Sequence, residues 1–191
     1  MDTRERVTRL CDRLHDQPQF ATQGGTLFVD LERHETCRYF LPREIFENYL
    51  GGRGANMALL YNLLPEGLDP LDPQVPLIFG AGVLASLIPG APRGNVSGVA
   101  PDSDAILDSN AGDYFPSFMR RHGIDHIVLY GRSPGWTVLK LGQGTTEFLD
   151  GECYQGMDNI ALTTAIEGDF ACQEGRDMAM ARITRAGENL V

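Results

Sequence analysis

Short apolar segments joined by tight turns constrain the fold of this chain more than any other feature. Residues 26–31 and 36–40 are rich in β-branched and aromatic residues, and the turn 32–35 joins them. Residues 136–141 and 145–149 flank Gly142-Gln143-Gly144 in the same manner, which predicts a hairpin. Because strands and helices mix without a regular βαβ order, we predict an α+β fold with antiparallel-rich β-sheets and short helices packed on them.

The first 25 residues differ in character from the rest. Val7, Leu10, Cys11 and Leu14 recur at helical spacing, so residues 4–15 predict an amphipathic helix. Residues 17–25 are rich in Gln, Gly and Thr and are typical of a linker. We therefore expect residues 1–25 to form a helical N-terminal extension and linker, and residues 26–191 to form the domain proper.

Further elements follow from local composition. Strands are predicted at residues 77–82, 95–99, 105–108, 125–130 and 178–183. Helices are predicted from Pro42 to Leu50, over 55–64, from Asn110 to Gly123, and over 158–167. The residues expected to face inward on the first three helices are Ile45, Phe46, Tyr49 and Leu50; Met57, Leu60, Tyr61 and Leu64; and Phe115, Phe118 and Met119. Residues 65–76 hold four prolines, so we expect no regular structure there.

Charge and composition exclude several classes of partner. The formal net charge is −10, so phosphate backbones and anionic lipid should repel the chain, and we expect no nucleic acid and no membrane partner. The chain has no apolar run of about 18 residues and no apolar signal-peptide segment at its start. The cysteines, at 11, 37, 153 and 172, form neither a CxxC pair nor a zinc or iron–sulfur motif, which fits a reducing cytoplasm.

Three glycine-rich segments are candidates for ligand binding. Gly51-Gly52-Arg53-Gly54 precedes a predicted helix, but it lacks the G-x-G-x-x-G spacing of a dinucleotide loop, and a corner between two helices explains it better. Asn110-Ala111-Gly112 is expected where a strand meets a helix, a point at which free N–H groups attract anions. Asn110 could equally serve only as a helix cap. Arg93, in a Gly/Pro loop, could bind a phosphate or be an ordinary surface arginine.

No catalytic constellation emerges from the sequence. The histidines, at 15, 34, 122 and 126, are dispersed, and Gly123 separates the last two, which makes a metal pair there a poor interpretation. The chain has no G-x-S-x-G motif and no P-loop.

Taken in order, several segments resemble one family across residues 26–191. The first match is Tyr49-Leu50-Gly51-Gly52-Arg53-Gly54 after the first hairpin, followed by Asp69-Pro70-Leu71-Asp72-Pro73, which matches the family pattern D-P-L-x-P. Next come Leu77-Ile78-Phe79-Gly80-Ala81-Gly82-Val83-Leu84, which matches L-I-x-x-A-G-x-L, and Asn110-Ala111-Gly112 with Tyr114-Phe115, which resembles A-N-S-G-G-Y-F. The last matches are Gly123, Asp125, Val128 and Gly131 with G-Y-D-A-I-V-V-x-G, and Ala186-Gly187-Glu188-Asn189-Leu190-Val191 with P-A-G-E-N-L-V. The chain resembles the N-terminal domain of the aldehyde ferredoxin oxidoreductases.

The resemblance implies a function that the residues alone do not show. Such enzymes hold tungsten, or molybdenum, between two pyranopterins bridged by magnesium, and they oxidise aldehydes to carboxylic acids. Electrons leave through a 4Fe–4S cluster to ferredoxin or another carrier. The N-terminal domain is a base of β-sheets that supports the pterins, and many members are homodimers. By position, Arg93 resembles the arginine that meets a pterin phosphate, and Asn110, Ala111 and Gly112 resemble the turn against the pterin.

The chain departs from the family pattern at several positions. Asp113 replaces a glycine, the loop 85–92 is one residue short and lacks T-G-G-R, and the segment Val99-Ala100-Pro101-Asp102-Ser103-Asp104 lacks the lysine of K-S-P-x-T-G. We expect a divergent, truncated member whose A-G-R-G-G motif and cluster cysteines would lie beyond residue 191, so that this chain alone is inactive. The alternative is a stand-alone pterin-binding, assembly or subunit protein derived from the domain.

Overall fold

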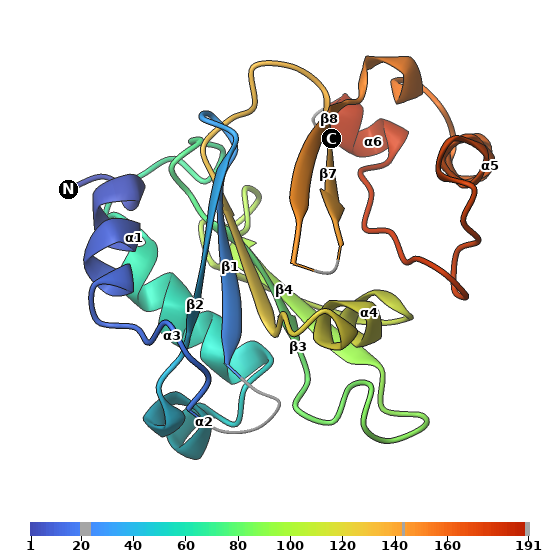
Figure 1. Ribbon diagram of the computed structural model, residues 1–191. Helices are drawn as coiled ribbons and strands as arrows, with labels where there is room; N and C mark the ends of the chain where they lie inside the picture. The colour runs from blue at the N-terminus through green and yellow to red at the C-terminus, as the bar shows by residue number, and fades with distance from the viewer. Residues whose placement is uncertain (20–23, 143, 190–191) are drawn as a thin grey trace. The chain divides into compact units, whose positions relative to one another are not determined.

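The protein consists of two compact units, Met1–Ser133 and Pro134–Val191. A computed structural model describes residues 1–19, 24–142 and 144–189 (Figure 1). Part of the expected linker, Gln143 in the expected hairpin turn, and the terminal Leu190 and Val191 lie outside the described residues.

A six-stranded mixed sheet forms the first unit (Figure 1). The strand order is β2-β1-β6-β3-β4-β5, and only the β1–β6 pair is parallel. The strands are β1 (Gly25–Asp30), β2 (Glu35–Phe40), β3 (Leu77–Ala81), β4 (Arg93–Val99), β5 (Ile106–Gly112) and β6 (His126–Tyr130). The prediction of an α+β fold rich in antiparallel pairs is confirmed.

Helices cover both faces of this sheet. The helices are α1 (Thr3–Cys11), α2 (Arg43–Tyr49), α3 (Arg53–Leu63) and α4 (Phe115–Arg121). On β4, a Cβ built on Gly94 would meet Pro116 of α4, whereas the side chain of the next residue, Asn95, accepts a hydrogen bond from Asn56 of α3. Since neighbouring strand residues point to opposite faces, α3 and α4 lie on opposite sides of the sheet.

The main core lies between α3, α1 and one face of the sheet. Leu59, Leu60 and Leu63 of α3 pack with residues of β1, β3 and β6, among them the fully buried Phe28. Helix α1 adds Val7 and Cys11 to this cluster, and an ion pair of 2.6 Å joins Arg4 Nε to Asp30 Oδ2 at the end of β1. The predicted amphipathic helix therefore exists, though it ends at Cys11. The division into an extension and a separate domain stays a prediction.

The inward face of α3 differs from the predicted one. The buried residues are Ala55, Asn56, Leu59, Leu60 and Leu63, whereas Tyr61 is 87% exposed. The apolar pattern favoured large side chains as the inward residues, but the small Ala55 and the polar Asn56 are also part of the buried face. The predicted inward face of α2 was wrong for two of its four residues. Tyr49 and Leu50 are exposed, whereas Ile45 and Phe46 pack against the core as predicted.

The second unit contains an antiparallel hairpin and short helices. Strands β7 (Thr137–Leu141) and β8 (Thr146–Asp150) confirm the predicted hairpin, and helix α5 (Asn159–Phe170) begins after Asp158, whose carboxylate accepts hydrogen bonds from Ile160 N and Ala161 N. The turn η1 (Glu152–Tyr154) and helix α6 (Arg185–Glu188) complete the unit.

The predicted strand at residues 178–183 is wrong. Only an isolated bridge between Glu174 and Met178 occurs there, and no ladder forms with another described strand. Alternating apolar residues favour a strand only where a neighbouring strand pairs with them. None of the described helices is both long enough and apolar enough to cross a membrane.

Gly80 on β3 provides a test of how closely α3 packs on the sheet. A Cβ at this position would lie 2.3 Å from Asn56 Oδ1. Asn56 is fully buried, and its side chain is held by hydrogen bonds to β3, β4 and His126. We expect Gly80→Ala to lower the free energy of unfolding by about 1–3 kcal/mol, the usual range for overpacking. Urea denaturation followed by circular dichroism measures this change.

Gly98→Ala is the matched control, because it adds the same methyl group to the neighbouring strand β4. Its Cβ would meet nothing closer than 3.4 Å, which is ordinary contact. We expect its unfolding midpoint to stay near that of the wild type. Equal midpoints for the two variants would contradict the packing described for α3.

Candidate anion-binding site

The sequence placed Asn110, Ala111 and Gly112 at the start of a helix, and this was wrong. They are the last three residues of β5, the edge strand of the sheet, and the helix begins only at Phe115. Pairing with β4 explains the difference, because Arg93 lies opposite Gly112, Gly94 opposite Ala111, and Asn95 opposite Asn110. Asn110 is therefore not a helix cap, and any anion site here is built on a strand pair.

The strand pairing brings together Arg93, Asn110, Ala111 and Gly112, the four residues that the family resemblance assigns to the cofactor. Arg93, Asn110 and Gly112 share one face of the β4–β5 pair, since residues two apart point the same way and paired residues lie on the same side. Ala111 points to the other face, so only its main chain is available to a ligand on the Arg93 side. All four residues are exposed. The face that Arg93, Asn110 and Gly112 share is called the β4–β5 face below.

Arg93 lies flat against a glycine. A Cβ built on Gly112 would be 3.3 Å from the Arg93 Cζ and Nη1 atoms, so the absence of a side chain at 112 leaves room for the guanidinium. Among the described residues, Arg93 makes no side-chain hydrogen bond or ion pair. An exposed guanidinium of this kind can bind an oxyanion in a bidentate manner.

Beside Arg93 the face carries a second arginine that is already paired. Arg53 Nη1 donates to Asp108 Oδ2 at 3.0 Å, and Asn95 Nδ2 donates to Asp108 Oδ1 at 2.6 Å. These two donors, Arg53 first, hold the pKa of Asp108 below its usual range. Because the Arg53–Asp108 pair is neutral overall, Arg93 supplies the uncompensated positive charge of the β4–β5 face.

A buried hydrogen-bond network fixes this face from within. Asn56 Nδ2 lies within 3.3 Å of Ile78 O, Asn95 O, Asn95 Oδ1 and Ser97 Oγ, so one amide joins α3 to both β3 and β4. Asn95 Nδ2 in turn approaches Asn110 Oδ1 at 3.2 Å. The network therefore runs from a fully buried amide to an exposed residue of the candidate site.

His126 ends the network on its buried side. Its Nδ1 lies 2.8 Å from Asn56 Oδ1, and because the amide nitrogen already faces acceptors, the histidine must be the donor. Its Nε2 is buried without a hydrogen-bond partner among the described residues, as suits an unprotonated nitrogen. Burial, and then the positive charge of Arg120, lower the pKa of His126 to about 3.

A buried ion pair lies next to His126. Arg120 Nε is 3.4 Å from Asp125 Oδ1, and Arg120 also donates to Gly82 O and Val83 O at the end of β3. Burial raises the pKa of Asp125, while Arg120 opposes the shift. The pair fastens α4 to the strand ends and does not reach the β4–β5 face.

Two features of the sequence now have structural roles. Gly51 and Gly52 have positive φ and link α2 to α3, which confirms the helix–helix corner, and Arg53 of that motif reaches the β4–β5 face. Asp113 Oδ1 accepts a hydrogen bond of 2.9 Å from Phe115 N at the start of α4. The unusual carboxylate is therefore engaged in a turn.

The sequence missed Arg53, Asn56, Asn95 and Asp108 as members of the site. One signal was available: Asp108, Asn110 and Gly112 alternate with period two, as residues on one strand face do. Asn56 gave no usable signal, since a polar residue on a helix is usually exposed. No group of three or more potential metal ligands occurs among the described residues.

Comparison with known proteins identifies the family. The N-terminal domain of aldehyde ferredoxin oxidoreductase matches residues 26–191, so the first unit's sheet and the site on it lie within the matched region, and the chain belongs to this family. The resemblance predicted from the motifs is confirmed.

Individual relatives differ in what their names say they act on. The chain is 27% identical to "Aliphatic sulfonate oxidoreductase, WOR-like subunit" of Pyrococcus furiosus over 184 residues, covering 90% of this chain and 29% of the relative. It is 28% identical to the tungsten-containing aldehyde ferredoxin oxidoreductase of Thermococcus kodakarensis, covering 90% and 28%. The chain thus spans less than a third of the length of these relatives.

A solved structure shares the fold. The active site complex BamBC of benzoyl coenzyme A reductase, in complex with 1,5 dienoyl-CoA, matches with a TM-score of 0.75 and 29% identity. The match covers 78% of this chain and 23% of the solved chain. The domain therefore occurs in oxidoreductases whose names give different substrates.

The neutral His126 makes stability depend on pH in a defined direction. Below pH 6.5 the unfolded chain protonates this histidine but the folded chain does not, so the free energy of unfolding falls until about pH 3. Between pH 7 and pH 4.5 we expect this one group to remove about 2–3 kcal/mol. Urea denaturation at a series of pH values measures the loss.

His126→Asn is the matched variant, since its amide can still donate to Asn56 but does not titrate. We expect it to be less stable than the wild type at pH 7 and to lose less stability on acidification. Asp125 and the other acids titrate in both proteins, so the difference between the two profiles isolates His126. Parallel profiles would show that His126 is not buried in its neutral form.

Proposed function

We propose that the β4–β5 face binds the phosphate of a pyranopterin cofactor in a tungsten- or molybdenum-containing, iron–sulfur oxidoreductase. The observation that carries the proposal is the unpaired Arg93 guanidinium lying against Gly112, within a domain of the aldehyde ferredoxin oxidoreductase family. Four of the relatives are tungsten-containing aldehyde ferredoxin oxidoreductases by name, which supports tungsten as the metal.

The residues of the face fit a phosphate and its magnesium ion. Arg93 offers a planar set of donors, and Gly112 adds no side chain that would displace the guanidinium from this position. Since β5 is an edge strand, part of its main chain at residues 110–112 points away from β4 and can donate. The Asn110 carboxamide oxygen is the neutral oxygen ligand on the same side, of the type that magnesium accepts.

The cofactor, when bound, supplies the oxidation of an aldehyde to its carboxylic acid. This chain's contribution is to anchor and orient the cofactor, with Asn95 and Asn56 holding Asn110 in place. The 4Fe–4S cluster would have its ligands outside this chain, and electrons would pass to ferredoxin or another carrier. We place this activity in the cytoplasm, in a polypeptide of the length of the curated relatives that forms a homodimer.

Arg93→Ala tests the proposal through cofactor content rather than activity. In the protein expressed at its natural length, we expect the variant to retain less than about a tenth of the wild-type tungsten or molybdenum, since losing a charged phosphate contact costs about 1.5–3 kcal/mol. Plasma mass spectrometry measures the metal, and fluorescence of the oxidised pterin measures the cofactor.

Arg33→Ala is the control, because Arg33 is exposed in the turn between β1 and β2 and its loss changes the net charge equally. It should retain its full cofactor content. Equal cofactor content in both variants would contradict the assignment of Arg93. A wild-type protein of natural length without metal or pterin would favour the stand-alone assembly or subunit protein.

A further inference from the structure

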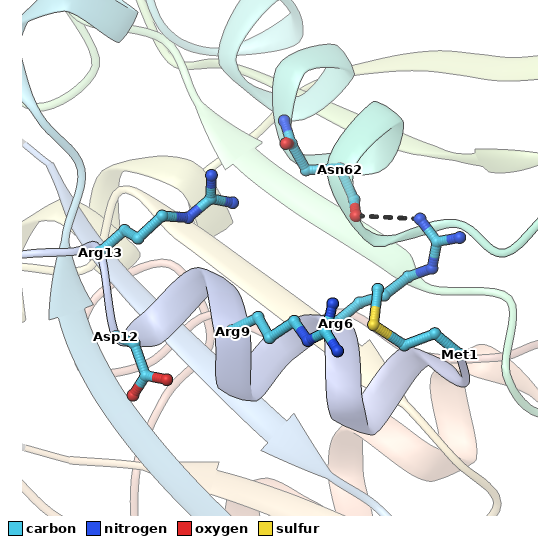
Figure 2. A pocket seen from close by; sticks show the side chains of 6 residues that line it. All are labelled: Met1, Arg6, Arg9, Asp12, Arg13 and Asn62. Carbon is cyan, nitrogen blue, oxygen red and sulfur yellow. Dashed lines mark hydrogen bonds between the residues drawn. The ribbon is translucent and has the colours of Figure 1, made fainter.

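Helix α1 carries an arginine cluster that the family does not account for. Arg6 and Arg9 lie on one side of α1, and Arg13 lies in the turn two residues after its end; α1 itself lies before the matched residues 26–191. With Met1, Asp12 and Asn62 they line an open pocket of about 430 Å³ between α1 and the end of α3 (Figure 2). These residues are called the α1 pocket below.

The positive charge of the α1 pocket is largely uncompensated. On the same helix, Arg4 is paired with both Asp30 and Glu32 at 2.6 Å. The described residues include no ion-pair partner for Arg6, Arg9 or Arg13, although the whole chain carries a net charge of −10. The one acid of the pocket, Asp12, points away from the side on which Arg6 and Arg13 extend (Figure 2).

Arg6 is the most constrained of the three arginines. Its Nη1 makes a long hydrogen bond of 3.5 Å to Asn62 O, in the last turn of α3, where carbonyl groups lack helical partners. Its Nε is buried and has no partner among the described residues. Because a buried donor without an acceptor is costly, the Arg6 guanidinium is incompletely satisfied by its contacts with the described residues.

We propose that the α1 pocket binds a phosphate group, either as free phosphate or as part of a small phosphorylated ligand. Three guanidinium groups on one wall suit a compact dianion, which accepts several charge-assisted hydrogen bonds at once. The net negative charge of the chain weakens long-range attraction of anions, so the pocket acts at short range. This inference does not rest on the function proposed for the β4–β5 face.

The test titrates the 191-residue chain with inorganic phosphate at constant ionic strength, using calorimetry or ³¹P line broadening. We expect saturable binding with a dissociation constant on the order of 1 mM, as a few charge-assisted hydrogen bonds would give. ADP provides the arm for a phosphorylated small molecule. Binding of ADP without binding of inorganic phosphate would show that the pocket takes a phosphorylated small molecule. Equal binding of ADP and inorganic phosphate would show that the pocket recognises the phosphate group itself.

The double variant Arg6→Ala/Arg9→Ala should weaken binding at least about tenfold, the effect of losing about 1.4 kcal/mol. The double variant Arg33→Ala/Arg132→Ala removes the same charge from exposed positions elsewhere and should bind like the wild type. Arg93→Ala separates the two sites, since it would remove only binding at the β4–β5 face. Circular dichroism verifies that each variant has kept the wild-type unfolding midpoint.

Three results would overturn the proposal. The first is the absence of saturable phosphate and ADP binding up to tens of millimolar, well above the expected constant. The second is equal weakening by the two double variants, which would indicate net charge alone. The third is tighter binding of an oligoglutamate peptide than of phosphate, abolished by Arg6→Ala/Arg9→Ala, which would make the pocket a contact for an acidic protein.

Discussion

The first unit depends on one buried amide, the side chain of Asn56. It lies on α3 with no exposed surface and joins β3, β4 and His126 of β6 through hydrogen bonds of 2.8–3.3 Å. Because a buried polar group without partners is costly, the position of α3 on the sheet is tied to these contacts as well as to the leucines around them. Gly80 is a glycine for the same reason, since any side chain there would meet the amide.

The same amide links the core to the candidate site. Asn56 holds Asn95, and Asn95 holds Asp108 and Asn110 on the edge strand. An edge strand is free to shift unless side chains fix it, so this interior connection gives the β4–β5 face a defined arrangement. The two arginines of this face differ in their ion pairing. Asp108 neutralises Arg53, whereas Arg93 has no ion-pair partner among the described residues and is available to bind an anion.

Much of the fold could be predicted from sequence, because the central strands β1, β3 and β6 are short, predominantly apolar and bounded by turns. The pairing of Arg93 with Gly112 could not be predicted. The register between β4 and β5 is set when the two strands pair in the folded chain, and local composition does not encode it. For that reason Asn110, Ala111 and Gly112 were expected at a helix start. The site residues were found through family motifs, whereas Asn56 and Asp108 needed the structure. The failed strand at 178–183 shows the same dependence on a pairing partner.

The most direct test of the role assigned to Arg93 is an experimental structure of the natural-length protein with its cofactor bound. We predict a cofactor phosphate oxygen within about 2.7–3.2 Å of the Arg93 guanidinium, with the main chain of residues 110–112 beside it and the Asn56–Asn95 hydrogen bonds intact. A bound pterin whose phosphates are held by other residues, with Arg93 facing solvent, would contradict it.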